Sequence, residues 1–315
     1  MNYNDAHFEF KVIEKLNKKI EMLMKCEAIV LNSIKCFLMA TNGHQQIENF
    51  ESFIQLIVKM RFNIESAHTL MPLLKVDYRF KTSINVLYRS SLDDIINIYY
   101  LLKFVIMENS GTEISNVQTS LGNELDILHR DFLKSISKVV EAEIEAEKYF
   151  QDSDVNNESR PFTWRKEMIE SNLHLFNQQK NDWKNNKEIR IASHGIFKNK
   201  YPSGNSFISE SAKIDFIITG GFKRGFILTK LFKYFSQFQH FSPKMHQFLL
   251  SNAENDLEYY HKQLIEILCV VIECNQIITT DQKQVIEDMV NADIVLLIKL
   301  YNEYITLEDS SSEQE

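Results

Sequence analysis

The scarcity of chain-breaking residues constrains the fold of this chain more than any other feature of its sequence. Only 8 glycines and 4 prolines occur among its 315 residues, whereas glycine alone makes up about 7% of an average globular protein. A fold built from strands needs many turns, and turns are formed mostly by glycine, proline, asparagine and aspartate. The sequence therefore predicts an all-α protein, a bundle of long antiparallel helices with few connections.

Hydrophobic periodicity locates these helices. Apolar residues recur every three or four positions with polar residues between them, which is the pattern of an amphipathic helix. The segments expected to be helical are 5–39, 47–74, 78–107, 115–150, 256–279 and 282–307. Pro72 should end or kink the second segment, because proline lacks a backbone donor and clashes with the preceding turn. The third segment is apolar on most sides, which predicts a place near the centre of the bundle.

A polar linker at Gln151–Phe162 divides the sequence. It separates an N-terminal helical bundle region, 1–150, from a C-terminal helical region, 161–307, which is expected to hold the candidate site and to share a core with the first. A small irregular insertion is expected from Ile191 to Gly225. Within it the segment IDFIIT, residues 214–219, is compatible with a short strand or with the end of a helix.

Neither end of the sequence predicts export or membrane insertion. The first residues are charged throughout and lack the apolar core of a secretory signal, and no stretch approaches the ~18 uninterrupted apolar residues of a membrane span. The acidic end, 308–315, has low complexity and is expected to be disordered. The cysteines, which form no C-x-x-C pair and lie in apolar helical contexts, are Cys26, Cys36, Cys269 and Cys274. Buried free thiols in a reducing cytoplasm are therefore expected.

Charge is distributed unevenly along the chain. The net charge of -8 and the pI of 5.7 argue against a general duplex-DNA-binding protein, which usually has a basic domain. From Phe216 to Ala253, however, the sequence contains no aspartate or glutamate. The residues of this basic window that are candidates for RNA binding are Lys223, Arg224, Lys230 and Tyr234. Basic residues interleaved with aromatic ones suit single-stranded nucleic acid, although core aromatics with snorkelling lysines give the same pattern.

The segment Phe226–His240, read as a helix, gathers polar side chains on one stripe. These are Thr229, Lys233, Ser236 and His240, which are spaced by three and four positions. A histidine near its ordinary pKa can move a proton of a ribose hydroxyl, a lysine can stabilise phosphate charge, and the serine can orient the histidine or the substrate. A helix whose polar stripe simply faces water explains the same spacing.

A second candidate lies in the third helical segment. Arg89 and Asp93 are four residues apart, so they can pair on one helix face, and Asp94 follows directly. One interpretation is an ion pair that orders the bundle. In the other, Arg89 is a phosphate clamp that Asp93 holds in place. The second interpretation requires this helix to pack against the helix that begins near Phe226.

The segment LFKYFSQFQHFSP, residues 231–243, resembles part of a known family. It is similar to the Tyr-x-x-Leu-Ser-x-x-x-His segment of a bacterial helical family of uncertain function that is related to the HEPN superfamily. The matching residues are Tyr234, Phe235, Ser236 and His240. A second segment, RSSLDDIINIYYL, resembles that family's earlier Arg-x-x-x-Glu helix. Together the two segments cover a small part of the chain.

The match of the second segment places Arg89 at the family's arginine and Asp93 at its acidic position. The usual HEPN signature is an arginine followed closely by a histidine. Here Lys233 stands in the arginine position before His240. Arg190 and His194 come close to the signature with a spacing one residue too short, and on a helix they would still share a face.

The resemblance implies a function as well as a fold. HEPN proteins are helical bundles, often dimeric, and many are metal-independent ribonucleases in phage defence or toxin–antitoxin systems. It therefore implies a homodimer that acts on RNA without a cofactor or metal, with His240, Lys233, Ser236 and Arg89 as catalytic residues and an antitoxin-like protein as a partner. The alternative is a non-catalytic helical module that binds a partner protein or nucleic acid. The sequence contains no P-loop, G-x-G-x-x-G, H-E-x-x-H or G-x-S-x-G motif, so other common enzyme classes are not expected.

Overall fold

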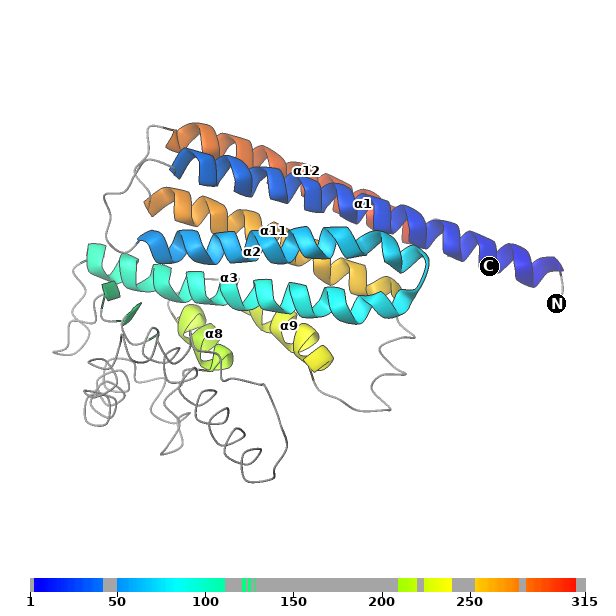
Figure 1. The fold of residues 1–315 in the computed structure, drawn as a ribbon, viewed down its shortest axis with the longest axis horizontal. Coiled ribbons are helices and arrows are strands. Elements are labelled where there is room, and N and C mark those ends of the chain that lie inside the picture. Colours follow the sequence, from blue (N-terminus) through cyan, green and yellow to red (C-terminus); the bar gives the residue numbers. More distant parts are fainter. Residues whose placement is uncertain are drawn as a thin grey trace, which may run out of the picture. The chain divides into compact units, whose positions relative to one another are not determined.

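The computed structural model describes most of the predicted helical segments (Figure 1). The described residues are 3–41, 50–110, 121–122, 124–125, 128, 209–219, 224–239, 253–277 and 282–309. All regular structure in this part of the chain is helical, with seven α-helices, short 3₁₀ helices and no strand. The predicted all-α fold is therefore confirmed. The linker and most of the predicted helix 115–150 lie outside the described residues.

The five long helices agree with the predicted segments. Their bounds are α1 (Tyr3–Thr41), α2 (Phe50–Leu70), α3 (Lys81–Ser110), α11 (Ala253–Ile277) and α12 (Lys283–Asp309). Pro72 acts as predicted, because α2 ends at Leu70 and a 3₁₀ helix, Met71–Lys75, follows with the proline in its first turn. The expected start of the disordered tail at residue 308 is wrong by two residues. α12 includes Glu308 and Asp309.

The chain divides into two compact units, one formed by Met1–Leu102 with Ile217–Glu315 and the other by Lys103–Phe216. In the second unit the rings of Phe104 and Phe216 pack with their centroids 5.6 Å apart. The Nζ of Lys103 donates a hydrogen bond to the carbonyl of Phe216. The predicted boundary at 151–162 lies outside the described residues, so the predicted domain division stays a prediction.

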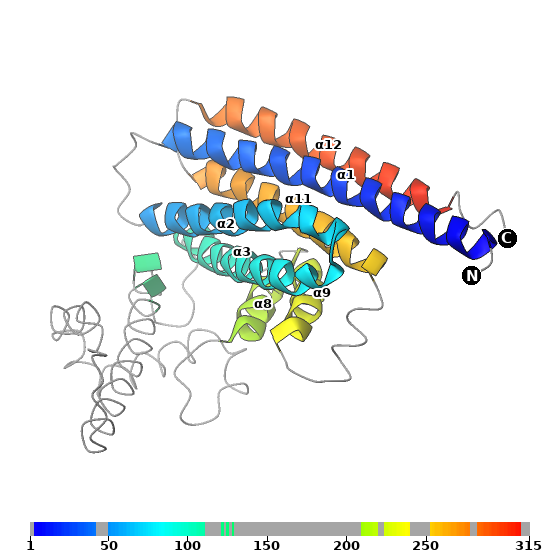
Figure 2. The same ribbon diagram turned by 45° about the vertical axis from the view of Figure 1, so that its right-hand side comes forward.

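Within the first unit the long helices lie side by side. α1 and α12 are neighbours, α2 and α11 lie next to them, and α3 lies beyond α2 and α11 (Figures 1 and 2). α1, α3 and α11 run in one direction, and α2 and α12 run in the opposite direction (Figures 1 and 2). The hydroxyl of Ser33 on α1 donates to Asp293 on α12, and Lys59 on α2 pairs with Asp94 on α3 at 2.7 Å. The predicted bundle of antiparallel helices is therefore present.

α3 is buried on most of its circumference, as its composition predicted. Its fully buried apolar residues are Ile84, Tyr88, Leu92, Ile95, Ile96, Ile98, Tyr99, Tyr100 and Phe104. Since consecutive residues on a helix point about 100° apart, buried residues at adjacent positions such as 98, 99 and 100 cover different sides of the helix. Burial on several sides is what a central helix requires.

The short helix α8 (Glu210–Thr219) resolves the ambiguity of the segment IDFIIT. This segment is helical, so the part of the predicted irregular insertion that the structure describes is regular. Ser209 caps the helix, because its hydroxyl accepts a hydrogen bond from the amide of Ala212 at 3.2 Å. Glu210 in the first turn adds a favourable interaction with the helix dipole.

The helix expected from Phe226 to His240 is shorter than its sequence suggested. α9 (Gly225–Ser236) ends at Ser236, and a 3₁₀ helix, Gln237–Gln239, follows it. The amide of Gln237 donates to the carbonyl three residues back, which tightens the chain into this 3₁₀ turn. The α-helical stripe predicted for this segment therefore does not continue beyond Ser236.

Candidate functional site

Stacked aromatic rings fix α9 against α3 and α11. Phe235 is fully buried, and its centroid lies 6.0 Å from Tyr88 on α3 and 6.0 Å from Tyr260 on α11, with the rings nearly parallel in both pairs. Tyr234 stacks flat on Tyr259 of α11 at 3.8 Å. Aromatic pairs of this kind stabilise a fold by about 0.5–1.5 kcal/mol beyond the area that they bury.

The start of α9 depends on a close backbone approach. Gly225 is buried, and a Cβ built on it would lie 2.3 Å from Cγ1 of Ile218. No side chain fits at this position without displacing the isoleucine. The last turn of α8 and the first turn of α9 can therefore approach each other only with glycine here.

Arg89 connects α3 to α9. Its guanidinium carbon lies 4.3 Å from the centroid of the Phe232 ring on α9, and its Nη1 pairs with Asp93. The side chain of Arg89 is only 5% exposed. The packing of these two helices, which the phosphate-clamp interpretation required, is therefore present. The buried geometry favours an ion pair that orders the helices, and phosphate binding by Arg89 stays a prediction.

A buried carboxylate lies behind the aromatic cluster. Glu27 of α1 is fully buried and accepts hydrogen bonds from the hydroxyl of Tyr88 at 2.7 Å and from Nδ1 of His68 at 3.0 Å. Burial raises the pKa of Glu27, while the two hydrogen bonds oppose the increase. The hydrogen bond to Glu27 raises the pKa of His68. This cluster joins α1, α2 and α3, and Tyr88 connects it to Phe235.

Arg224, which directly precedes α9, forms an ion pair with a glutamate of α11. The Nη1 of Arg224 donates to Oε1 of Glu266 at 3.0 Å. Glu266 is 2% exposed, and its burial raises its pKa against the effect of the arginine charge. The predicted RNA-binding residue Arg224 is therefore held in an ion pair.

Two lysines converge on one tyrosine further along the same helices. The Nζ atoms of Lys230 on α9 and Lys262 on α11 lie 5.7 and 5.9 Å from the centroid of the Tyr259 ring. Lys262 also pairs with Glu258 one turn earlier on α11. Lys230 is exposed, whereas Lys262 is half-buried. This end of the α9–α11 contact is therefore basic and aromatic.

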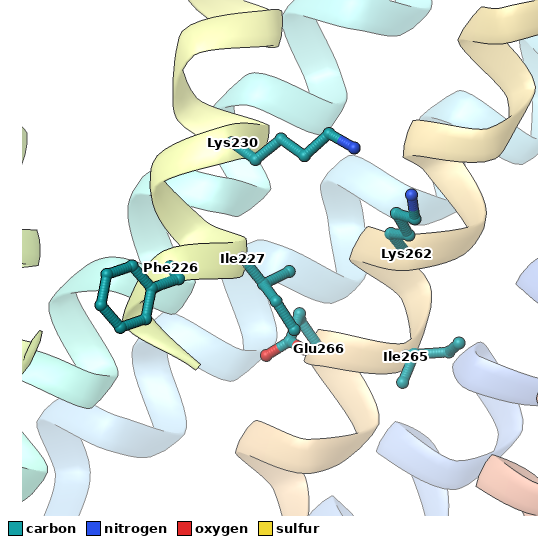
Figure 3. A pocket seen from close by; sticks show the side chains of 6 residues that line it. All are labelled: Phe226, Ile227, Lys230, Lys262, Ile265 and Glu266. Carbon is teal, nitrogen blue, oxygen red and sulfur yellow. The ribbon is translucent and has the colours of Figure 1, made fainter. Parts of the chain in front are cut away.

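Between these two ends lies an open groove of about 380 Å³. It is lined by Phe226, Ile227 and Lys230 from α9 and by Lys262, Ile265 and Glu266 from α11 (Figure 3). The two lysine side chains extend toward each other at one end, and Ile227 points toward Glu266 of α11 (Figure 3). The ring of Phe226 lies on the side of α9 away from α11 (Figure 3). Phe226 is 68% exposed and Ile227 is 41% exposed. A large exposed aromatic beside an apolar groove is typical of a binding surface.

The predicted site residues on α9 differ in their exposure and in their contacts. Lys233 is exposed on α9, one turn beyond Lys230. Ser236 is partly buried, and its hydroxyl has no hydrogen-bond partner within the described residues. Tyr234 has one ring face covered by Tyr259. The predicted residues outside the described part of the chain are His240, Lys223, Arg190 and His194.

Three residues of this face were not predicted from the sequence. Tyr259, Lys262 and Glu266 all belong to α11, beyond the end of the acid-free window at Ala253. The sequence EYYHKQ, in which two tyrosines precede a lysine by two and three positions, carries the signal for the first two. Nothing in the local sequence indicates that Glu266 would approach Arg224.

The described part of the chain has neither a metal-binding cluster nor a membrane-spanning helix. No group of three histidine, cysteine, aspartate or glutamate side chains there could hold a metal ion. None of the helices that the structure describes combines the length and apolar character needed to cross a membrane. In comparisons with known proteins, no family model, no curated protein and no solved structure matched this chain.

Proposed function

We propose that this chain binds single-stranded RNA along the face formed by α9 and the first half of α11. The observation that carries this proposal is the groove between these helices, which has lysines at one end and exposed apolar side chains in its lining. Proteins that bind single strands combine positive charge that follows the phosphates with flat apolar surfaces that contact the bases. The face offers both.

The charge of α9 supports an anionic ligand. α9 contributes Lys230 and Lys233 and no acidic residue, so its own charge is positive by two. On α11, Lys262 is paired with Glu258, and the first turns also carry Glu254 and Asp256. Arg224 and Glu266 cancel each other in their ion pair. A local positive surface of this kind attracts phosphate even though the chain as a whole has a net charge of -8.

Charge reversal on α9 tests the proposal. We expect Lys230→Glu/Lys233→Glu to weaken binding of a fluorescein-labelled RNA of about twelve nucleotides by at least tenfold at low salt. Loss of two phosphate contacts should also make the plot of log K against log salt less steep by about 1.4, because each contact on a single strand contributes about 0.7. Fluorescence anisotropy of the purified full chain in EDTA measures both quantities.

A matched variant separates a local effect from a change in net charge. Lys25→Glu/Lys299→Glu makes the same charge change at exposed lysines on α1 and α12, and it should bind RNA as the wild type does. If both double variants lose affinity equally, the binding face lies elsewhere. If the wild type binds no RNA, or binds it independently of salt, the proposal is wrong, and an acidic protein becomes the candidate ligand.

A second candidate function is metal-independent RNA cleavage, with His240 as the acid or base. The contact between Arg89 and Phe232 favours it, since it brings together the two helices that carry the HEPN-like segments. In this function Lys233 binds phosphate and Ser236 orients the histidine or the substrate. The resemblance also implies a role in phage defence or in a toxin–antitoxin pair, a homodimeric state and a cytoplasmic location. These stay predictions.

Cleavage is tested by incubating purified protein with RNA in EDTA. We expect the wild type to degrade the RNA and His240→Ala to lose this activity, because the proton transfer has no other group of suitable pKa on the same segment. Equal cleavage by both proteins would exclude His240 as the catalytic group. Binding without cleavage in either would leave the binding function alone.

A further inference from the structure

We infer that the groove between α9 and α11 holds one unstacked nucleotide of the RNA strand, with its base against the apolar side chains and its phosphate between Lys230 and Lys262. This inference rests on the proposed function and assigns a position to one part of the ligand. The groove volume of about 380 Å³ lies within the range of about 300–1,000 Å³ that is common for small-ligand pockets.

The two ends of the groove differ in charge, and this difference gives the nucleotide a direction. Lys230 and Lys262 form the positive end, where both ammonium groups lie within 6 Å of the centroid of the Tyr259 ring. Glu258 pairs with Lys262, so these three residues together carry one net positive charge. At the opposite end Glu266 lies beside Ile227 (Figure 3) and is paired with Arg224, so this end has no net positive charge to attract a phosphate. A strand that lies across the groove therefore binds its phosphate at the lysines and turns its base toward the other end.

The middle of the groove is lined by apolar side chains, which can contact a base but cannot pair with a charged group. Ile227 of α9 and Ile265 of α11 line the space, and the exposed residue Phe226 also belongs to its lining. Bases of single-stranded RNA can leave the stack and contact aromatic and apolar side chains. Tyr234 and Tyr259 already stack on each other, so Phe226 is the aromatic ring of this groove that is open to a base.

A thermodynamic cycle between RNA and protein tests the base position. The probes are a labelled RNA of about eight nucleotides and a ribose-phosphate chain of the same length without bases. Removing the bases should weaken binding to the wild type by about 5- to 100-fold, which corresponds to stacking of one base. Phe226→Ala/Ile227→Ala should weaken binding of the intact RNA by at least about fivefold and leave binding of the abasic chain unchanged.

The control variant is Phe62→Ala/Val295→Ala, which removes two apolar side chains of similar exposure, 59% and 67%, on α2 and α12. It should retain the wild-type difference between the two probes. If the groove variant weakens both probes equally, the base position is wrong while RNA binding stands. If neither probe binds, the proposed function itself fails. Free AMP binding as tightly as the RNA would assign the groove to a nucleotide instead of a strand.

Discussion

Phe235→Ala is expected to lower the free energy of unfolding by about 3–5 kcal/mol, the usual range for removing a buried aromatic ring. The ring is fully buried and lies between Tyr88 and Tyr260, so its loss leaves a cavity where α3, α9 and α11 meet. An effect of this size changes the folding equilibrium by more than about a hundredfold. Urea denaturation followed by circular dichroism measures it.

Phe62→Ala provides the comparison for this variant, since Phe62 is 59% exposed on α2. Its effect should stay within about 0.5 kcal/mol, as is usual for surface substitutions. Phe235→Leu, which refills much of the cavity, should recover part of the loss. Unfolding curves for Phe235→Ala that overlay those of the wild type would mean that α9 does not pack against the bundle in solution.

Glu27→Leu is expected to destabilise the protein by about 1–3 kcal/mol, because it leaves the buried hydroxyl of Tyr88 without its acceptor. That hydroxyl donates to Glu27 at 2.7 Å, and both residues are fully buried. The second variant, Glu27→Leu/Tyr88→Phe, removes donor and acceptor together. It should be more stable than Glu27→Leu, since no polar group remains buried without a partner. Urea denaturation of the wild type and both variants measures the difference.

The pH dependence of the same comparison provides an independent control. Glu27 raises the pKa of His68, so this pair stabilises the fold below the ordinary histidine pKa, and that contribution is lost as pH rises through the higher folded pKa. Burial raises the pKa of Glu27, so ionisation of Glu27 weakens the fold in the same direction. The advantage of the wild type over Glu27→Leu should therefore decrease as the pH is raised from 6 to 8. An advantage that grows with pH would contradict this assignment.

The helices themselves were accessible from the sequence because each depends on residues near one another in the chain. The periodicity of apolar residues located α1, α2, α3, α11 and α12, and Pro72 marked the end of α2. The expected end of the Phe226 helix was wrong. The amide of Gln237 donates a hydrogen bond to the carbonyl of Tyr234, three residues earlier, and this bond begins a 3₁₀ turn after Ser236. Side-chain spacing does not reveal which of two helical hydrogen-bond patterns the backbone follows.

The candidate site was only partly accessible from the sequence. Its α9 half, including Lys230 and Lys233, followed from the window that lacks acidic residues. In the folded protein an acidic residue does reach this window. Glu266, which is 42 positions away in the sequence, accepts a hydrogen bond from Arg224. Of the basic residues of the window that the structure describes, Arg224 is therefore held in an ion pair, while Lys230 lies at the lysine end of the groove.

The sequence alone determined the fold class and the positions of the long helices, because helical periodicity and the scarcity of chain breakers can be read from residues that are close together in the chain. Only the tertiary structure decided which charged residues form ion pairs and where a ligand could lie. Tyr88 meets Glu27 across 61 positions, and the groove takes half of its lining from α11. Such contacts depend on how the helices pack, and that packing brings together side chains that local sequence patterns cannot connect.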